Sequence, residues 1–242
     1  MQSTSSASTE PRRNSLLTSL DAGEYSELLD GAENVGLELR HVFYEANAPI
    51  THVYFVTHGV ASIIAPVGDG ASVEVGTVGN EGLIGLPLLL GADREAAKAF
   101  VQVAGSALRV TAAAFQHCVA TSPALRGLFL RYAHSYLSQV SQSSACNRAH
   151  SIEERCARWL LLTHDRVGAD EFPLTHEFLS FMLGVRRAGV TVAAGILQKA
   201  GFIDYTHGRI TIVDREGLEG AACACYRIIR ASYNGLIRPP TT

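Results

Sequence analysis

A single long helical stretch divides this sequence into two unlike halves. Ser122 can cap a helix and Pro123 fits its first turn, and the chain then runs to about Asn147 without another proline. Bulky side chains recur there at alternating steps of four and three residues, the period of a coiled-coil seam. They are Leu125, Phe129, Tyr132 and Tyr136, continued by Gln139, Ser143 and Cys146. The pattern predicts a dimerisation helix over residues 123–150 and a homodimer. A helix that packs only on its own domain is the alternative, since the seam becomes polar after Tyr136.

The half before this helix has the pattern of a β domain. Short runs rich in β-branched and aromatic residues alternate with glycine from residue 37 to 110, as in 52–56, 60–64 and 100–103. They predict closely spaced strands in a sandwich, roll or barrel over residues 21–122. Residues 1–20 open with a polar Ser/Thr-rich stretch that shows no periodicity, and we expect a disordered tail there.

The half after the long helix, residues 151–242, carries the signals of a separate domain. Ser151 and Glu154 have capping-box spacing and open a new helix. Thr175 can cap a short helix that ends at Gly184, and another helix follows over about 186–199. Residues 202–205 and 209–213 flank a turn and predict a hairpin, and a closing helix is expected from 214 to 236. Two short helices joined by a glycine turn and followed by a hairpin predict a winged helix-turn-helix, in a chain of the α+β class.

The second helix of this motif is predicted to read DNA. Its leading end can enter the major groove, where arginine makes bidentate contacts with guanine. We expect Arg187 to contact a base and Arg186 to contact phosphate or base, although a solvated helix start would explain either arginine alone. Four cations stand against the single anion Asp204 between Arg186 and Arg209. The candidate DNA contacts are Thr175, Arg186, Arg187, Gly189, Val190, Thr191, Lys199 and Arg209.

Several segments resemble the Crp/Fnr family of regulators. The C-terminal similarity rests on residues 174–191, 197–203 and 208–214, and the N-terminal similarity on residues 54–56, 59, 73–79 and 81–85. The resemblance implies a cyclic-nucleotide-binding-like β-roll (a jelly roll), a dimerisation helix and a winged helix-turn-helix. It further implies a homodimer that reads a palindrome in double-stranded DNA under the control of an effector in the roll. RNA polymerase is a further candidate partner.

The family's cyclic-AMP contacts are missing from this sequence. The Gly-Glu pair that holds the ribose in that family is matched by Gly85-Leu86, and the Arg-containing phosphate pair by Ala96-Ala97. A buried cyclic phosphate without an arginine would stay unpaired, and Lys98 would supply only a point charge. We therefore expect an unidentified small-molecule effector rather than cyclic AMP.

The apolar run 83–90 is expected to belong to the hydrophobic core of the roll. The alternative interpretation is an effector pocket, which would suit an apolar or aromatic ligand. The candidate pocket residues are Val75, Glu81, Gly82, Leu83, Ile84, Gly85, Leu86 and Lys98.

The remaining features mainly exclude functions. In one continuous helix the thiols of Cys223 and Cys225 would point about 200° apart, so no metal site or other cofactor is expected. No nucleophile elbow, P-loop or zinc-protease motif suggests an enzyme. Without a long apolar run or a signal core we expect no membrane association and a cytoplasmic protein.

Of the family's three base readers only Arg187 is matched, with Ala188 and Val192 at the other two positions. The alternative function is therefore a sensor of a redox or protein-partner signal with weak DNA binding.

Overall fold

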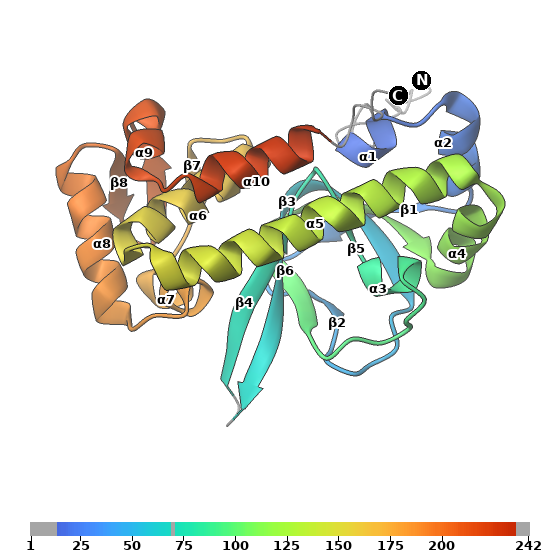
Figure 1. Ribbon diagram of the computed structural model, residues 1–242, viewed down its shortest axis with the longest axis horizontal. Helices are drawn as coiled ribbons and strands as arrows, with labels where there is room; N and C mark the ends of the chain where they lie inside the picture. Colours follow the sequence, from blue (N-terminus) through green and yellow to red (C-terminus); the bar gives the residue numbers. More distant parts are fainter. Residues whose placement is uncertain (1–13, 69–70, 236–242) are drawn as a thin grey trace, which may run out of the picture.

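A computed structural model describes residues 14–68 and 71–235 of the chain. Figure 1 shows one long helix, α5 (Pro123–Ala149), running from a β-rich domain to a mainly helical one. Ser122 accepts a hydrogen bond from the backbone of Leu125, and Pro123 occupies the first turn. The long helix that the sequence predicts is therefore present, with the predicted start.

The β-rich domain is a roll built on one antiparallel sheet. Its strands are β1 (Glu33–Leu37), β2 (Val42–Tyr44), β3 (His52–Gly68), β4 (Ala71–Val78), β5 (Leu83–Ile84) and β6 (Lys98–Thr111). They are ordered β1-β6-β3-β4, with β2 paired to β6 and β5 to β3. The roll also carries the helices α1 (Ser15–Thr18), α2 (Ala22–Leu28), α3 (Leu86–Leu89) and α4 (Ala112–Thr121). The long strands β3 and β6 form the middle of the sheet, because their apolar runs can be buried on both faces.

Part of the segment expected to form a disordered tail is folded. Residues 1–13 lie outside the described residues, but residues 14–20 pack on the roll. The Asn14 amide is fully buried and donates hydrogen bonds to the carbonyls of Val56 (2.8 Å) and Gly82 (2.7 Å), while its oxygen caps α1. Leu16 and Leu17 are buried in the core. The polar composition of this segment concealed two buried leucines and one capping residue.

The residues predicted to form the dimer seam lie on the inward face of α5, so this prediction was wrong. Leu125 and Phe129 are fully buried and Tyr132 is 1% exposed, because all three pack against the chain's own core. The Tyr132 hydroxyl donates a hydrogen bond to the Leu83 carbonyl (3.0 Å), and Tyr136 is partly buried beside Gly76. The seam predicted from these four residues is therefore the contact between α5 and the roll, which is the alternative that the sequence left open for them.

The C-terminal domain contains the predicted helix-turn-helix and hairpin. Its helices are α6 (Ile152–Val167), α7 (His176–Leu183), α8 (Arg187–Lys199), α9 (Arg215–Ala221) and α10 (Cys225–Asn234). Its strands β7 (Glu171–Pro173), β8 (Ile203–Thr206) and β9 (Arg209–Ile212) form a sheet in the order β7-β9-β8. The short strand β7 was not predicted, since three residues are too few to show an alternating pattern.

The closing helix is broken, contrary to the sequence prediction. Helix α9 ends at Ala221, the backbone of the next residue, Ala222, is extended (φ −78°, ψ 148°), and α10 begins at Cys225. Cys223 lies in the break, so the angle of about 200° expected for a continuous helix does not apply to Cys223 and Cys225. Neither glycine nor proline marks this break, which is why the sequence did not reveal it.

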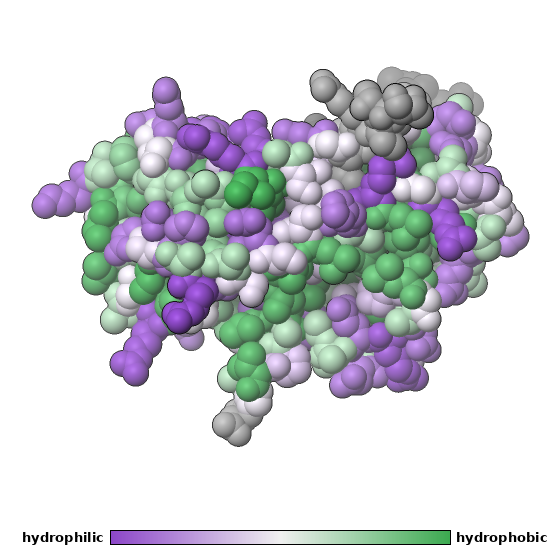
Figure 2. All heavy atoms as spheres, viewed as in Figure 1, coloured by the Kyte–Doolittle hydropathy of each residue, from purple (hydrophilic) through white to green (hydrophobic). Residues whose placement is uncertain are grey.

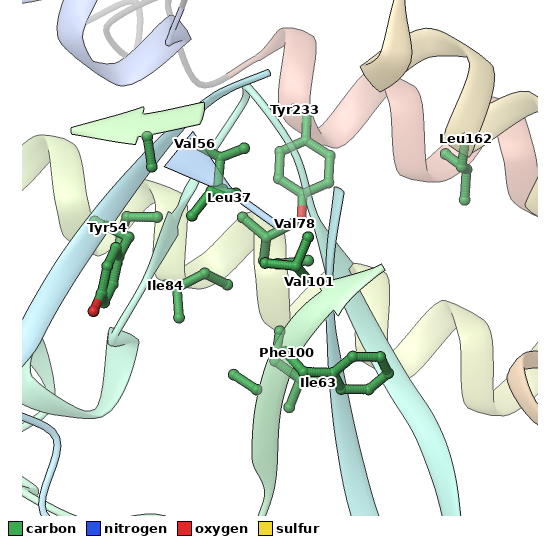
Figure 3. Close-up of a cluster of buried hydrophobic side chains, with 14 of the residues drawn as sticks. Leu37, Tyr54, Val56, Ile63, Val78, Ile84, Phe100, Val101, Leu162 and Tyr233 are labelled. Atoms are coloured by element: carbon green, nitrogen blue, oxygen red, sulfur yellow. The ribbon is translucent and has the colours of Figure 1, made fainter. Parts of the chain in front are cut away.

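A buried arginine joins the two domains. Arg166 on α6 is nearly buried and donates to Glu81 Oε1 of the roll (2.9 Å) and to the Thr77 hydroxyl (2.5 Å). It also donates to the side-chain oxygen of Gln139 on α5 (2.8 Å). Apolar packing continues around these contacts, and Figure 3 shows Ile63, Val78 and Tyr233 in the same buried cluster. One guanidinium thus holds together the roll, the long helix and the C-terminal domain.

We expect Arg166→Met to lower the free energy of unfolding by about 3 kcal/mol, because it leaves the largely buried Glu81 carboxylate without its partner. Denaturant unfolding would measure the change. Arg109→Met is the matched control, since Arg109 pairs with the exposed Glu33 and should cost less than about 1 kcal/mol. Adding Glu81→Gln to Arg166→Met should recover part of the loss. Equal losses for Arg166→Met and Arg109→Met would contradict the role given to this contact.

Candidate nucleic-acid interface

Helices α7 and α8 meet in the geometry of a helix-turn-helix. The Thr175 hydroxyl accepts a hydrogen bond from the Phe178 backbone (3.1 Å) and caps α7, and Gly184 ends it with a left-handed backbone (φ 62°). The two helices cross at 106°, within the range of about 90–120° typical of the motif. Among the described residues no single helix is long and apolar enough to span a membrane, and only this bent pair has the length and composition when taken together.

The second helix, α8, buries one face and exposes the other. Val190, Ala193, Ala194 and Leu197 are buried with the helical spacing of three and four residues. Val190 therefore belongs to the core and was wrongly predicted to contact DNA. Gly189 also faces inward, because a Cβ there would lie 3.1 Å from the Ile152 side chain.

The leading end of α8 presents exposed polar and cationic side chains. Arg186 and Arg187 are both exposed, and Thr191 follows Arg187 one turn later on the outer face. The Thr191 hydroxyl lies 3.1 Å from His176 Nδ1 on α7. Burial, and then the charge of Arg187, lowers the pKa of His176. This shift favours the neutral imidazole, which joins the two helices through the Thr191 hydroxyl.

The hairpin forms a wing beside the start of α7. Thr206 pairs with Arg209, and the two residues between them, His207 and Gly208, have positive φ (51° and 76°), as in a type I′ turn. A Cβ on Gly208 would lie 3.7 Å from the Thr175 methyl. Thr175 and the wing are therefore brought together.

The other two predicted cations do not belong to the leading end of α8. Arg209 forms an exposed ion pair with Glu171 on the neighbouring strand β7. Lys199 is at the last turn of α8, about 18 Å along the axis from Arg187 at 1.5 Å per residue. Arg186, Arg187 and Thr191, with Thr175 and the wing, form the candidate interface.

Comparison with known proteins decides the family. The Crp-like helix-turn-helix domain matches residues 154–221, and the cyclic nucleotide-binding domain matches residues 36–122. The chain belongs to the Crp/Fnr family. It is a transcription regulator of that type, with a DNA-binding helix-turn-helix and a cyclic nucleotide-binding domain. No curated protein sequence matches it.

Solved Crp/Fnr structures share the fold at low sequence identity. FixK2 from Bradyrhizobium japonicum is 17% identical, with a TM-score of 0.68 over 80% of this chain and 98% of that one. The c-di-GMP-responsive global regulator CLP from Xanthomonas campestris is 17% identical, with a TM-score of 0.62 over 79% and 99% of the two chains. TTHA1359, a CRP/FNR-family transcriptional regulator from Thermus thermophilus, is 20% identical, with a TM-score of 0.64 over 78% and 98%.

In this Crp/Fnr regulator an apolar cavity of about 130 Å³ lies between the roll and α5. Four of the predicted pocket residues line it, and they are Leu83, Ile84, Gly85 and Leu86. Tyr132, Tyr136 and Leu137 contribute the α5 wall. The tyrosines were assigned from the sequence to a dimer seam, so their place beside the cavity was missed.

The other four predicted pocket residues are engaged elsewhere. Glu81 pairs with Arg166, Lys98 pairs with Glu45 at the surface (2.9 Å), and Gly82 makes room for the Tyr132 ring. Val75 borders a second, smaller cavity next to Trp159. These residues were assigned to the pocket because they lie near the apolar run in the sequence, which does not show in which direction their side chains point.

The charge beside the cavity disfavours an anionic ligand. Glu95 lines the cavity and accepts a hydrogen bond from the Tyr44 hydroxyl (2.9 Å). None of the described residues that line it is an arginine or a lysine. Arg94 is instead exposed and donates to the Asn47 carbonyl (2.8 Å). A cyclic phosphate here would face a carboxylate and no arginine.

A second polar contact between the domains centres on Glu74 of β4. Its carboxylate accepts hydrogen bonds from the Ser62 hydroxyl (2.8 Å) and from the Trp159 indole of α6 (3.0 Å). Burial raises the pKa of Glu74 to about 7, against the lowering effect of these hydrogen bonds. The sequence showed no sign of this contact, because Glu74 and Trp159 are 85 residues apart.

We expect Glu74→Gln to change how stability depends on pH. The folded carboxyl group titrates near 7 and the unfolded one near 4.5, so the native chain holds the proton more tightly. Wild type should therefore lose stability as the pH rises from about 4.5 to 7, and the variant should not lose this part. The free energy of unfolding of the variant should rise relative to that of wild type over this range, and the gain should level off above about pH 7 at about 1–3 kcal/mol. Urea unfolding between about pH 5 and 8 tests this, with the exposed Glu38→Gln as control, and parallel curves for Glu74→Gln and wild type would refute it.

Proposed function

We propose that this Crp/Fnr regulator acts as a homodimer that reads a palindromic operator in double-stranded DNA through the leading end of α8. The exposed pair Arg186 and Arg187, at the start of a helix that crosses α7 at 106°, carries the proposal. Arg187 is assigned to a guanine and Arg186 to phosphate or base. A DNA-bound dimer of this kind works in the cytoplasm, with RNA polymerase as its expected partner.

Removing the Arg187 guanidinium should weaken binding to the operator and relax its sequence preference. A bidentate contact contributes about 1–3 kcal/mol of discrimination per half-site, or about 2–6 kcal/mol for the two half-sites of the dimer, so we expect Arg187→Ala to reduce the preference for operator over scrambled duplex by at least about 30-fold. The operator is selected from a randomised duplex library, and affinities are then measured by fluorescence anisotropy over a salt series.

Lys199→Ala provides the matched control, since Lys199 is exposed at the far end of the same helix and should leave the preference unchanged. If Arg187→Ala weakened the affinity for the operator and for scrambled duplex equally, Arg187 would be assigned to a phosphate contact. A wild-type protein that selects no sequence would favour the second candidate function.

The second candidate function is a sensor whose C-terminal domain receives a protein partner and binds DNA weakly. Val192 and Ile196 favour it, because they are 59% and 49% exposed on the outer face of α8. Figure 2 shows hydrophobic surface over α8 at the left edge of the molecule. An apolar stripe of this kind is uncommon on a surface that meets phosphates.

The dimer seam of the proposal is the outward face of α5. Exposed side chains recur there at steps of four and three residues in Leu130, His134, Leu137 and Ser141. Leu130 is 43% exposed and Leu137 56% exposed. Figure 2 shows hydrophobic surface over α3 and the neighbouring part of α5. A second copy that packs on this face would bury these leucines.

We expect Leu130→Arg to raise the dissociation constant of the dimer by at least about 100-fold, because burial of a leucine contributes about 1.5–3 kcal/mol in each of the two copies. Sedimentation equilibrium measures the change. Leu39→Arg is the control, since Leu39 is an exposed leucine of the roll remote in sequence from α5 (54% exposed). A dimer that Leu130→Arg leaves intact would place the interface on another face.

The effector of the proposal is a small apolar or aromatic molecule in the cavity between the roll and α5. A dry apolar cavity of about 150 Å³ is known to bind benzene, and this cavity of about 130 Å³ has a similar size. Cyclic AMP is disfavoured by the carboxylate of Glu95. Leu137 lines the cavity and also lies on the outward face of α5, so an occupant would touch the proposed dimer seam directly.

A further inference from the structure

Three cysteines and one histidine converge where α5 meets the C-terminal helices. Cys146 and His150 lie one turn apart at the end of α5, Cys223 lies in the break between α9 and α10, and Cys225 is the first residue of α10. One ligand atom from each of the four side chains lies within 4.8 Å of every other. The Sγ atoms of Cys146 and Cys223 are 3.4 Å apart, and Cys225 Sγ is 3.6 Å from His150 Nδ1.

These distances suit one tetrahedral ion. Zinc–sulfur bonds of about 2.3 Å and zinc–nitrogen bonds of about 2.0–2.1 Å place the ligand atoms of a tetrahedron about 3.5–3.8 Å apart. A cluster of two or four irons would divide the ligands among different metal atoms and hold them farther apart than one ion requires. We propose that Cys146, His150, Cys223 and Cys225 bind a single zinc ion.

The local backbone explains why four ligands can meet here. Cys146 and His150 have the i, i+4 spacing that puts two side chains on one side of a helix. The extended conformation of Ala222 removes Cys223 from α9, and the helical turn at Ala224 (φ −54°, ψ −20°) begins α10 at Cys225. Both thiols therefore reach the same point, which a continuous helix would not allow.

The three cysteines are also separated from the main hydrophobic core. Cys146, Cys223 and Cys225 are at most 5% exposed and form a small buried cluster of their own. Cys156 is equally buried but packs among the apolar side chains of the main core, where a thiol behaves as a small hydrophobic group. Three thiols packed mainly on one another are better explained by a shared ligand.

Two buried arginines supply the charge that such a site needs. Three thiolates, a neutral imidazole and Zn²⁺ together carry one negative charge. Arg155 and Arg158 are 8% and 6% exposed, and both interact electrostatically with Cys146. Among the described residues the Nε atoms of both arginines lack a hydrogen-bond partner. The Gln142 amide already donates to Cys225 Sγ (3.1 Å), as a residue next to a metal ligand typically does.

Zinc would fasten the C-terminal helices to the end of α5. The site lies next to Ser151, where α6 and the DNA-binding domain begin, and it does not include the leading end of α8. The proposal is therefore independent of the proposed function, and zinc content can be measured without any DNA.

The test begins with the full-length, untagged protein purified under reducing conditions without chelator. We expect about one zinc ion per chain by inductively coupled plasma mass spectrometry. After removal of zinc, Co²⁺ should bind in its place and give the intense visible absorption of a tetrahedral cobalt site together with a thiolate-to-cobalt charge-transfer band.

Variants separate this site from adventitious binding. Cys146→Ser and Cys225→Ser should each weaken metal binding by more than about 100-fold, since even a residue beyond the ligands typically contributes 10–100-fold. His150→Cys should keep the ion with four sulfur ligands and strengthen the charge-transfer band, and so tests the site even if the serine variants fail to fold. Cys156→Ser is the matched control, and Arg187→Ala should also retain its zinc.

Three outcomes would overturn the proposal. One is a protein that holds no metal and binds no Co²⁺. Another is iron together with acid-labile sulfide. The last is a Cys146–Cys223 disulfide, found by mass spectrometry in protein that never contained zinc.

Discussion

The buried Arg166 is the constraint on which the arrangement of the two domains depends. Its guanidinium reaches Glu81 and Thr77 of the roll and Gln139 of α5 from its place on α6. A buried guanidinium is costly unless its donors are satisfied, and a small rotation between the domains would break several of these hydrogen bonds together. The Glu74–Trp159 contact adds a second polar contact between the same two domains. Apolar packing alone would tolerate more sliding, so these polar contacts specify one orientation.

Helix α5 connects this orientation to the proposed effector and dimer sites. Its inward face carries Tyr132 and Tyr136, which line the cavity, and Gln139, which accepts from Arg166. Its outward face carries Leu137, which borders the cavity as well. A ligand that moves the tyrosines would therefore act on the same helix that contacts Arg166. This gives a short physical route from the cavity to the DNA-binding domain, although differential binding to two states would still have to supply the energy.

Local sequence signals predicted the parts of the fold that depend on local chemistry. Ser122 and Pro123 began α5, Thr175 and Gly184 bounded α7, and the turn at His207-Gly208 joined the wing strands. What depends on distant partners was not predictable in this way. Arg166 and Glu81, which pair with each other, are 85 residues apart in the sequence. Val190 was predicted to contact DNA because the sequence placed it on α8 but did not show that this side of the helix is buried. The break at Cys223 has no glycine or proline to signal it.

The error over the dimer seam has a general physical cause. Helix α5 has two stripes with nearly the same period, one through Leu125, Phe129 and Tyr132 and the other through Leu130, His134 and Leu137. The first stripe is bulkier and more apolar, and a rule that assigns the most apolar stripe to the partner chain selects it. A roll domain needs that stripe for its own core, because the sheet alone cannot cover both of its faces. In a domain of this kind the dimer interface is therefore expected on the less apolar stripe, where exposed leucines alternate with polar residues that water can solvate before the second copy binds.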